Sequence, residues 1–402
     1  MASERTAMGE SARREPVRAA VYNDPKFRSI AYQIVLCAVV AFLVWGAISN
    51  AIENLQRAKI ASGFGFWDNT AGFDISQTLI EYSSQGSTYG RAFWVGLLNT
   101  LLVAGLGIVF ATILGFIVGI GRLSTNWLVA KICGGYVELV RNVPLLLQLL
   151  FWYNAVLKAL PDIRDSLKLV GGGYLNNRGI FLPEPVFGAG AGLAGLALLA
   201  GIAGAIGYRI YARRRQMQTG EQSPVLWVTL ALVVALPLLA LAVMQFPVTF
   251  VYPEMGRFNI RGGIEVLPEF VALLVGLSIY TAAFIAEVVR AGIRSVAHGQ
   301  TEAAYSLGLR PGPTLRLIVV PQAMRVIVPP LTSQYLNLTK NSSLAVAVGY
   351  PDLVQVFTGT VLNQTGQAVE VVAITMAVYL TISLITSFAM NLYNRRIALV
   401  ER

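Results

Sequence analysis

Long stretches of apolar sequence constrain this chain more than any other feature. Eight such stretches carry few charges, at about residues 30–50, 93–120, 128–157, 188–210, 225–245, 267–290, 323–345 and 369–391. About 20 apolar residues in a helix cross the hydrocarbon core of a bilayer, and backbone polar groups there must be satisfied within the protein. Only 13% of the residues are charged, against about a quarter in soluble domains. The sequence therefore predicts an all-α integral membrane protein with about eight transmembrane helices.

Basic residues are distributed unevenly between the segments that connect these stretches. Twenty of the 31 lysines and arginines lie in residues 1–29, 122–131, 209–215, 290–325 and 395–402. Nine lie in residues 51–91, 158–178 and 246–265. Basic segments stay on the cytoplasmic side of a membrane, and an even number of spans puts both termini on one side. We therefore expect a cytoplasmic tail at 1–29, a retained first span at 30–50 and a cytoplasmic C-terminus.

Glycine and proline mark close packing within the spans and turns between them. Gly115 and Gly119 form a small-xxx-small pair, and further glycines crowd the fourth stretch. Small residues at this spacing let helix backbones approach closely. Residues 158–187 contain three consecutive glycines and a Pro-Glu-Pro turn, which predict an external loop.

Several classes of function are excluded by residues that the chain lacks. The formal charge of +10 comes from residues that flank the apolar stretches, which disfavours a nucleic-acid surface. Cys37 and Cys133 lie in hydrophobic stretches and are expected to be small buried side chains, and His298 alone cannot build a metal cluster. None of the six lysines follows a glycine, so the phosphate-binding G-x4-G-K-[ST] motif is absent. We therefore expect no catalytic residue, metal or cofactor in this chain.

Residues 299–321 predict a short helix between two breaks in the chain. The residues before Gly308 favour a helix, and Gly308 suits a left-handed stop at its end. Pro313 suits the first position of the next helix. A short helix that projects between two spans has a suitable shape for docking into a groove of a partner. Its spacing, E-A-A-x3-G-x9-I-x-x-P from Glu302 to Pro321, resembles the EAA loop of permeases in bacterial ATP-binding-cassette (ABC) importers.

Three further segments resemble the polar amino acid family of these permeases. They are residues 136–148, 286–293 and 340–344. The resemblance covers about residues 90–160 and 265–395, and the extra first span and the inserted spans at 188–245 resemble those of long permease subunits of general amino acid importers. It implies a type I ABC importer fold, with a permease domain at 93–395, in the bacterial inner membrane.

The resemblance also implies the partners of this chain. The chain would be a non-catalytic subunit that forms half of a pathway for L-amino acids of broad range, beside a second permease subunit. A dimer of ATP-binding subunits would bind ATP and Mg, and a periplasmic amino-acid-binding protein would deliver the substrate. Coupling to the ATPase would involve Glu302, Ala303, Ala304, Gly308, Leu309 and Arg310.

A substrate pathway is expected along the sixth and seventh stretches. An amino acid presents a carboxylate and an ammonium group, and interrupted helices at membrane depth offer polar groups for both. Pro329 and Pro330 predict such an interruption. The candidate residues are Ser278, Tyr280, Thr281, Asn337, Lys340, Asn341 and Ser342. Hydrogen bonding between helices is an alternative interpretation of these side chains.

The main alternative function is an ion-coupled secondary amino acid transporter. Such a protein should contain inverted repeats and carboxylates at mid-membrane, whereas acidic residues are sparse in these stretches and no convincing repeat is found. Charges within a span suggest function, and Arg141, Glu287 and Lys340 qualify. Structural roles are open for two of them, because Glu287 can pair with Arg290 and Arg141 can bind carbonyls freed by Pro144.

Overall fold

The computed structural model contains two compact units, which are described separately. It describes residues 25–57, 63–188, 191–245, 248–256 and 259–397. One unit consists of Met1–Phe64 and Thr365–Glu370, and the other of Gly65–Gln364 and Val371–Arg402. Most of the predicted cytoplasmic tail, residues 1–24, lies outside the described residues.

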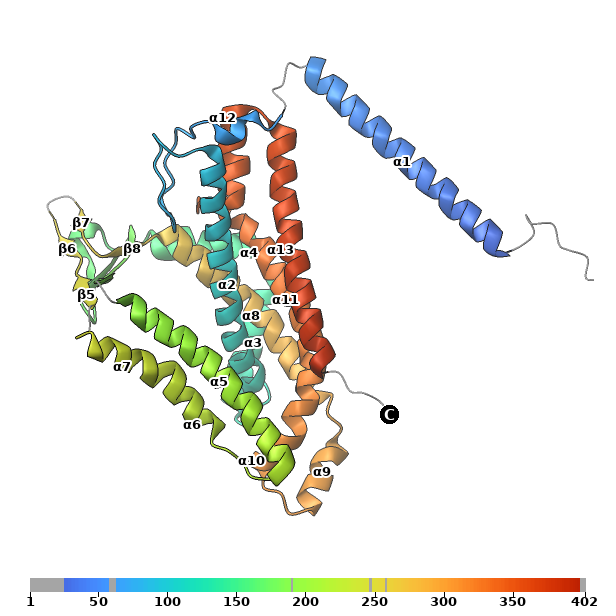
Figure 1. Cartoon of the computed structure of the whole chain (residues 1–402), viewed down its shortest axis with the longest axis vertical. Coiled ribbons are helices and arrows are strands. Elements are labelled where there is room, and N and C mark those ends of the chain that lie inside the picture. The colour runs from blue at the N-terminus through green and yellow to red at the C-terminus, as the bar shows by residue number, and fades with distance from the viewer. Residues whose placement is uncertain (1–24, 58–62, 189–190, 246–247, 257–258, 398–402) are drawn as a thin grey trace, which may run out of the picture. The chain divides into compact units, whose positions relative to one another are not determined.

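The first unit contains one long helix, α1 (Pro25–Arg57), which includes the predicted first span (Figure 1). Apolar side chains such as Phe42 and Trp45 are more than 70% exposed on it. A helix that is apolar all round suits an environment of lipid. In the same unit the backbone N–H of Gly63 donates to the Glu370 carboxylate at 2.5 Å.

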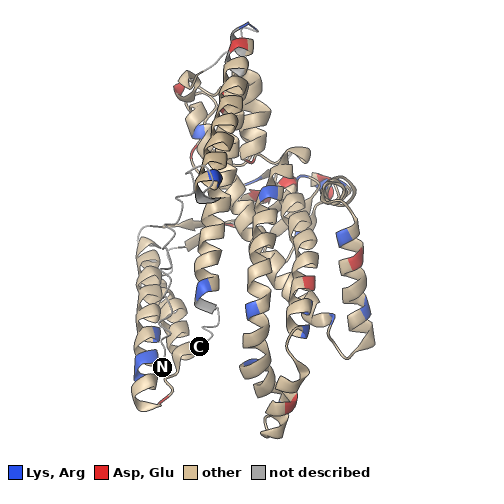
Figure 2. Cartoon of the chain, turned by 90° about the vertical axis from the view of Figure 1, so that its right-hand side faces the viewer, with Lys and Arg blue, Asp and Glu red and all other residues tan. Residues whose placement is uncertain are grey.

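With α1, seven helices among the described residues are long and apolar enough to cross a membrane. Three of the other six are α2 (Tyr89–Gly121), α5 (Ala191–Thr219) and α8 (Pro268–Arg294). One is the run α6 (Val225–Leu230), η5 (Ala231–Ala235) and α7 (Leu236–Val243). Another is the run α10 (Pro311–Thr314), η6 (Leu315–Val319), α11 (Val320–Asn341) and η7 (Ser342–Ala347), and the last is α13 (Ala368–Ile397). Most of the ribbon carries no charge (Figure 2).

The predicted span at 128–157 is not a single helix. Instead, α3 (Trp127–Asn142) ends before Pro144, and the chain continues as α4 (Leu145–Leu150) and the π-helical η3 (Phe151–Leu157). Proline lacks an N–H donor and disfavours helical backbone in the residue before it. Pro144 therefore divides the apolar stretch into two pieces.

This divided run still follows α8 along most of its length. Val140 of α3 packs with Ala283 in one buried cluster. Leu149 of α4 packs with Leu273 in another, and the Tyr153 hydroxyl of η3 donates to Glu269 at 2.7 Å. The run therefore extends beside α8 from Ala283 to Glu269, as two helical segments separated at Pro144.

Close packing of α2 on α8 forms the centre of the second unit. A Cβ atom on Gly115 would lie 2.5 Å from Ile285, and one on Gly119 would lie 2.8 Å from the Ala286 carbonyl. These distances confirm the predicted small-xxx-small pair. On another side of α8, a Cβ atom on Gly292 would lie 2.3 Å from Ile327 of α11.

Short strands occupy the segments expected to be loops outside the spans. Four strands form one antiparallel sheet, in the order β1 (Leu167–Leu169), β2 (Gly173–Asn176), β3 (Gly179–Leu182) and β8 (Ile264–Val266). Two further pairs are β4 (Glu184–Phe187) with β5 (Val248–Val251), and β6 (Glu254–Met255) with β7 (Ile260–Arg261). Gly171 and Gly172 have φ of 95° and 87° between β1 and β2, which glycine adopts without steric cost. The pairing of β3 with β8 thus joins segments about eighty residues apart, which the sequence did not predict.

The inserted spans form a helical hairpin in which α5 packs against α6, η5 and α7 (Figure 1). A Cβ atom on Gly201 would lie 2.0 Å from the Leu232 carbonyl oxygen, so only glycine fits at this crossing. The β4–β5 pair joins the ends of the hairpin.

The remaining short helices connect these spans. They are η2 (Gly65–Asp68), η4 (Ile163–Asp165), α9 (His298–Ser306), η8 (Val354–Val361) and α12 (Leu362–Thr365). η2, η8 and the start of α2 share a buried aromatic cluster, in which the Phe93 and Phe357 ring centroids are 5.3 Å apart.

Candidate functional site

A cavity of about 360 Å³ lies between α8 and α11, where the pathway is expected. It is lined by Tyr280, Thr281 and Phe284 of α8 and by Gln334, Asn337 and Asn341 of α11. The α11 residues recur at spacings of three and four, so they share one face of the helix. The volume is within the range of small-molecule sites, about 300–1,000 Å³.

The walls of this cavity combine hydrogen-bonding groups with aromatic rings. Amide side chains offer both donors and acceptors, and the Tyr280 and Phe284 ring centroids are 5.0 Å apart. The Arg141 guanidinium carbon of α3 lies 5.1 Å from the Phe284 ring centroid. A guanidinium favours a carboxylate, and an aromatic face attracts a cation. The cavity itself thus offers amide, hydroxyl and aromatic groups, and Arg141 adds a positive charge behind the Phe284 ring.

Four of the seven predicted pathway residues line this cavity, namely Tyr280, Thr281, Asn337 and Asn341. The other three do not. Ser278 is buried, and its hydroxyl has no hydrogen-bond partner among the described residues. Lys340 is exposed. Ser342 is fully buried, and its hydroxyl donates to the Thr339 carbonyl at 2.7 Å.

Phe284 and Gln334 are lining residues that the sequence reasoning missed. Gln334 precedes Asn337 by three positions, so the helical periodicity of polar residues on α11 could have found it. Phe284 resembles any other apolar residue of α8 in the sequence. The sequence marks Arg141 as a charge within a span, and the structure places it against Phe284 in the cavity wall.

The predicted interruption of the seventh span lies later than expected. Pro329 and Pro330 are inside α11, which continues to Asn341 and is followed by the 3-10 turn η7. Each proline leaves the carbonyl four residues before it without its helical donor. The α-helix nevertheless continues through the proline pair, and the interruption of this span begins at Ser342.

The predicted docking helix is present as α9, and a Schellman motif ends it. Gly308 has φ of 77°, its N–H donates to the Tyr305 carbonyl, and the Leu309 N–H donates to the Ala304 carbonyl. The left-handed stop at Gly308 is thus confirmed. The prediction for Pro313 is wrong, because α10 begins at Pro311, whose fixed φ suits the first helical position equally well.

The predicted coupling residues divide between two faces of this segment. Glu302, Ala303, Gly308 and Arg310 are exposed, Leu309 is half-buried, and Ala304 is 1% exposed. The Gln322 amide donates to Gln300 at 3.2 Å and so links α11 to α9. The structure therefore presents a polar outer face on a short helix that is anchored through Ala304.

Glu287 forms ion pairs with two arginines at the end of α8. Its carboxylate contacts Arg290 on the same helix and Arg122 just after α2. The predicted pairing of Glu287 with Arg290 is confirmed. Arg122 was not predicted as a partner, because it is distant in the sequence.

A second polar cluster surrounds Asp352, between η7 and η8. Its carboxylate accepts from the Gln355 backbone N–H at 2.8 Å and from the Tyr379 hydroxyl at 3.1 Å. Asn99 and Thr100 of α2 bond the backbone of Pro351 and Leu353. Asp352 is fully buried, and burial raises the pKa of its carboxyl to about 7. The cluster holds the connection between α11 and α13 against α2.

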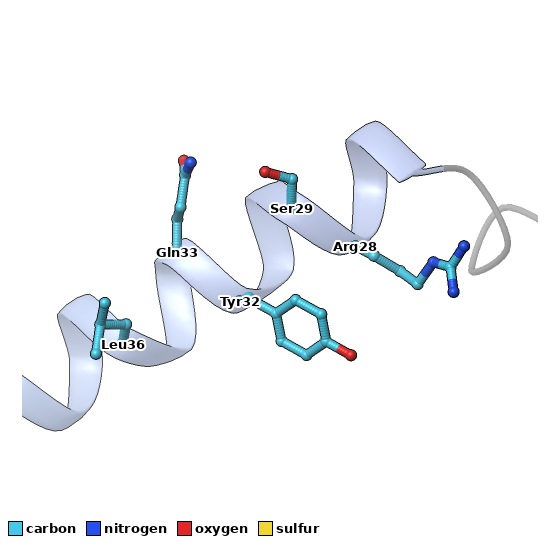
Figure 3. A pocket seen from close by; sticks show the side chains of 5 residues that line it. All are labelled: Arg28, Ser29, Tyr32, Gln33 and Leu36. Atoms are coloured by element: carbon cyan, nitrogen blue, oxygen red, sulfur yellow. The ribbon is translucent and has the colours of Figure 1, made fainter.

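The described part of the chain contains no candidate metal cluster. No three His, Cys, Asp or Glu side chains among the described residues could hold a metal. Cys133 is half-buried, but Cys37 is exposed on α1, so its predicted burial is wrong. The side chains around a hollow on α1 fan out from the helix instead of converging (Figure 3); they are Arg28, Ser29, Tyr32, Gln33 and Leu36.

Comparison with known proteins gives matches along the chain. Residues 215–399 match the family described as binding-protein-dependent transport system inner membrane component. The general L-amino acid transport system permease protein AapQ of Rhizobium johnstonii is 54% identical over 96% of this chain and 96% of its own length. The putative amino-acid ABC transporter permease protein YhdX of Escherichia coli is 49% identical over 98% and 100%. The glutamate/glutamine/aspartate/asparagine transport system permease protein BztB of Rhodobacter capsulatus is 46% identical over 94% and 96%.

Proposed function

This chain belongs to the family of binding-protein-dependent transport system inner membrane components, and we propose that it is a permease subunit of an ATP-driven importer of L-amino acids. The observation that carries the proposal is its end-to-end similarity to a general L-amino acid permease. The names of two further relatives also refer to amino acids. A broad range of amino acids is the substrate class that this similarity favours.

The cavity between α8 and α11 is the proposed contribution of this chain to the pathway. Its amide and hydroxyl groups suit the polar ends of an amino acid, which are common to every substrate. Arg141 beside Phe284 favours the carboxylate. A second permease subunit would supply the opposite wall of the pathway.

Segment 299–321, including α9, is the proposed contact with the ATPase. Its exposed residues Glu302, Ala303 and Arg310 are available to a groove on a partner. No lysine in the chain follows a glycine, which supports binding of ATP and Mg by a separate pair of ATP-binding subunits. A periplasmic amino-acid-binding protein would bring substrate to the opposite side.

The chain is a multi-pass inner membrane protein, and we propose that both of its termini are cytoplasmic. Seven helices within the described ranges qualify as spans, and the run from α3 to η3 follows α8 as an eighth crossing. An even number places the termini together, and the distribution of basic residues favours the cytoplasmic side. The α5–α6 turn and α9 then face the cytoplasm, and the strands face the periplasm.

Uptake by the reconstituted importer tests this function. Vesicles that contain this chain with its second permease and ATPase should accumulate labelled amino acids only with ATP inside and binding protein outside. Competition with each of the twenty amino acids then measures the range. Uptake by this chain alone, driven by a proton or sodium gradient without ATP, would instead support the secondary transporter.

A further inference from the structure

The inserted hairpin contains a polar hollow that the transport function does not explain. The hollow has a volume of about 600 Å³ and lies where α5 turns into α6. Its polar lining consists of Arg209, Arg213 and Gln216 from α5 and of Gln222 and Ser223 from the turn. These groups are donors of the kind that bind phosphate oxygens.

The charge of this region is strongly positive. Four arginines lie within residues 209–215, and Glu221 is the acidic residue in the turn. Glu221 pairs with Arg215 at 2.7 Å. Among the described residues, neither Arg209 nor Arg213 forms an ion pair, and the two lie four positions apart on one face of α5. Their charges are therefore available to an anion in the hollow.

Aromatic residues place the hollow at the depth of lipid headgroups. Tyr208 and Tyr211 lie beside Arg209 on α5, with ring centroids 6.3 Å apart. Trp227, at the start of α6, is 72% exposed. Tyrosine and tryptophan concentrate at the boundary between hydrocarbon and water. Both sides of the hollow thus carry residues typical of that boundary.

An exposed apolar strip on α5 leads directly to the two arginines. Leu199, Ile202 and Ile206 are 65%, 41% and 58% exposed. They recur at spacings of three and four and continue to Arg209 and Arg213, so all five positions share one helix face. A ligand with an anionic head and long apolar chains can occupy the hollow and the strip together.

We propose that this hollow binds the headgroup phosphate of an anionic phospholipid, with its acyl chains along the strip. Arg209 and Arg213 contact the phosphate, and Gln216, Gln222 and Ser223 complete its hydrogen bonds. The inserted hairpin, which packs chiefly on itself, is thereby anchored at the membrane surface. A zwitterionic lipid binds less well because its positive group meets the arginines.

Lipid titration of the full-length chain tests the proposal. The purified protein in neutral detergent is titrated with phosphatidylglycerol or phosphatidylcholine, and bound lipid is counted by native mass spectrometry. Arg213→Gln and Arg214→Gln form a matched pair, since each removes one charge from adjacent positions and only Arg213 lines the hollow. We expect Arg213→Gln to weaken phosphatidylglycerol binding about tenfold, the loss of one charge-assisted hydrogen bond. Arg214→Gln should change it little.

Further measurements separate the possible outcomes. Arg209→Gln with Arg213→Gln should abolish the preference for phosphatidylglycerol over phosphatidylcholine, while thermal unfolding confirms that the variant is folded. Inorganic phosphate should not displace the lipid, because it gains nothing from the apolar strip. Equal losses in Arg213→Gln and Arg214→Gln would indicate general charge attraction and overturn the proposal. Displacement of the lipid by inorganic phosphate would overturn the assignment to a lipid.

Discussion

Individual glycines have distinct physical roles in this chain, and their surroundings distinguish them. Gly308 has φ of 77° and open space around its Cα, so the backbone conformation alone requires glycine there. Gly119 is helical, but it lies against the Ala286 carbonyl, so the lack of a side chain is what matters. Each of these two roles leads to a separate prediction.

Replacement of Gly308 should weaken coupling between ATP hydrolysis and uptake. Gly308→Ala strains the left-handed stop by about 1–2 kcal/mol and so loosens the end of α9. Gly312→Ala is the control, because Gly312 has open space and no positive φ. We expect fewer amino acids imported per ATP hydrolysed by the reconstituted importer for Gly308→Ala only. If both variants import the same number of amino acids per ATP hydrolysed, the coupling role of Gly308 is contradicted.

Replacement of Gly119 should destabilise the contact between α2 and α8. A Cβ atom there would lie 2.8 Å from both the Ala286 carbonyl and Val289, and overpacking of this kind costs about 1–3 kcal/mol. Gly105→Val on the same helix is the control, because a Cβ atom at Gly105 would have no neighbouring atom within 4 Å. Thermal unfolding in detergent should show a lower midpoint for Gly119→Val alone. A similar fall in the unfolding midpoint of Gly105→Val would mean that the lower helix propensity of valine, and not overpacking, causes the destabilisation.

At the scale of elements, the connection between α11 and α13 depends on one buried carboxyl. Asp352 receives hydrogen bonds from the η8 backbone and from Tyr379 of α13. The loop around it is bonded to α2 through Asn99 and Thr100. The ionisation of Asp352 therefore affects the contacts with η8 and α13, while the bonds from α2 to the loop backbone hold the same loop in place.

The pH dependence of stability should reveal this group. The pKa of Asp352 is about 7 in the folded protein, against an ordinary value of 3.8. Between these values the folded protein holds a proton that the unfolded chain has released, so stability falls as the pH rises through this window. The unfolding midpoint of the natural protein should therefore fall relative to Asp352→Asn between about pH 5 and pH 7. A constant difference across this range would contradict the raised pKa.

The cavity face of α11 leads to a prediction about substrate handling. Asn337→Ala removes a lining amide and should lower the uptake rate several-fold, roughly the effect of one lost hydrogen bond. Ser333→Ala is the control, because Ser333 lies on α11 but does not line the cavity. The uptake rates of both variants are measured in the reconstituted importer. Unchanged uptake of every amino acid by Asn337→Ala would exclude Asn337 from the pathway.

At the scale of the whole molecule, the number of crossings decides where each connecting segment lies. α3, α4 and η3 are individually too short to qualify as spans, yet together they follow α8. Counting them as one crossing puts the turn between α2 and α3 and the strands on opposite sides of the membrane, and both termini on the same side. Without that crossing, the termini would lie on opposite sides.

Cysteine labelling tests this topology. Cys37 and Cys133 are first replaced by serine, and single cysteines are introduced as Val170→Cys between β1 and β2 or Met217→Cys near the end of α5. Both positions are at least 79% exposed. A membrane-impermeant maleimide added to intact spheroplasts should label Val170→Cys only, and inside-out vesicles should reverse the pattern. The reverse pattern, with Met217→Cys labelled from spheroplasts, would refute the eight crossings, because without the run from α3 to η3 and with a cytoplasmic N-terminus the two positions exchange sides.

The local features of the chain were predictable because each depends on residues close together in sequence. Apolar length identified the spans, the glycine stop identified the end of α9, and the G-x3-G spacing identified a close-packing face on α2. Four lining residues of the cavity were also named, since polar residues within apolar helices are conspicuous. Whether these residues form the pathway, and whether α9 contacts the ATPase, remain predictions.

Only the tertiary structure decided which distant segments meet, because periodicity and composition describe one segment at a time. The strands of β3 and β8, the pairing of Glu287 with Arg122 and the burial of Asp352 all need partners far along the chain. The placement of Arg141 beside Phe284 is of the same kind. The sequence by itself indicated a multi-spanning membrane permease with a short helix suited to docking. The fold determined where its polar groups converge, since that depends on how helices pack across the unit.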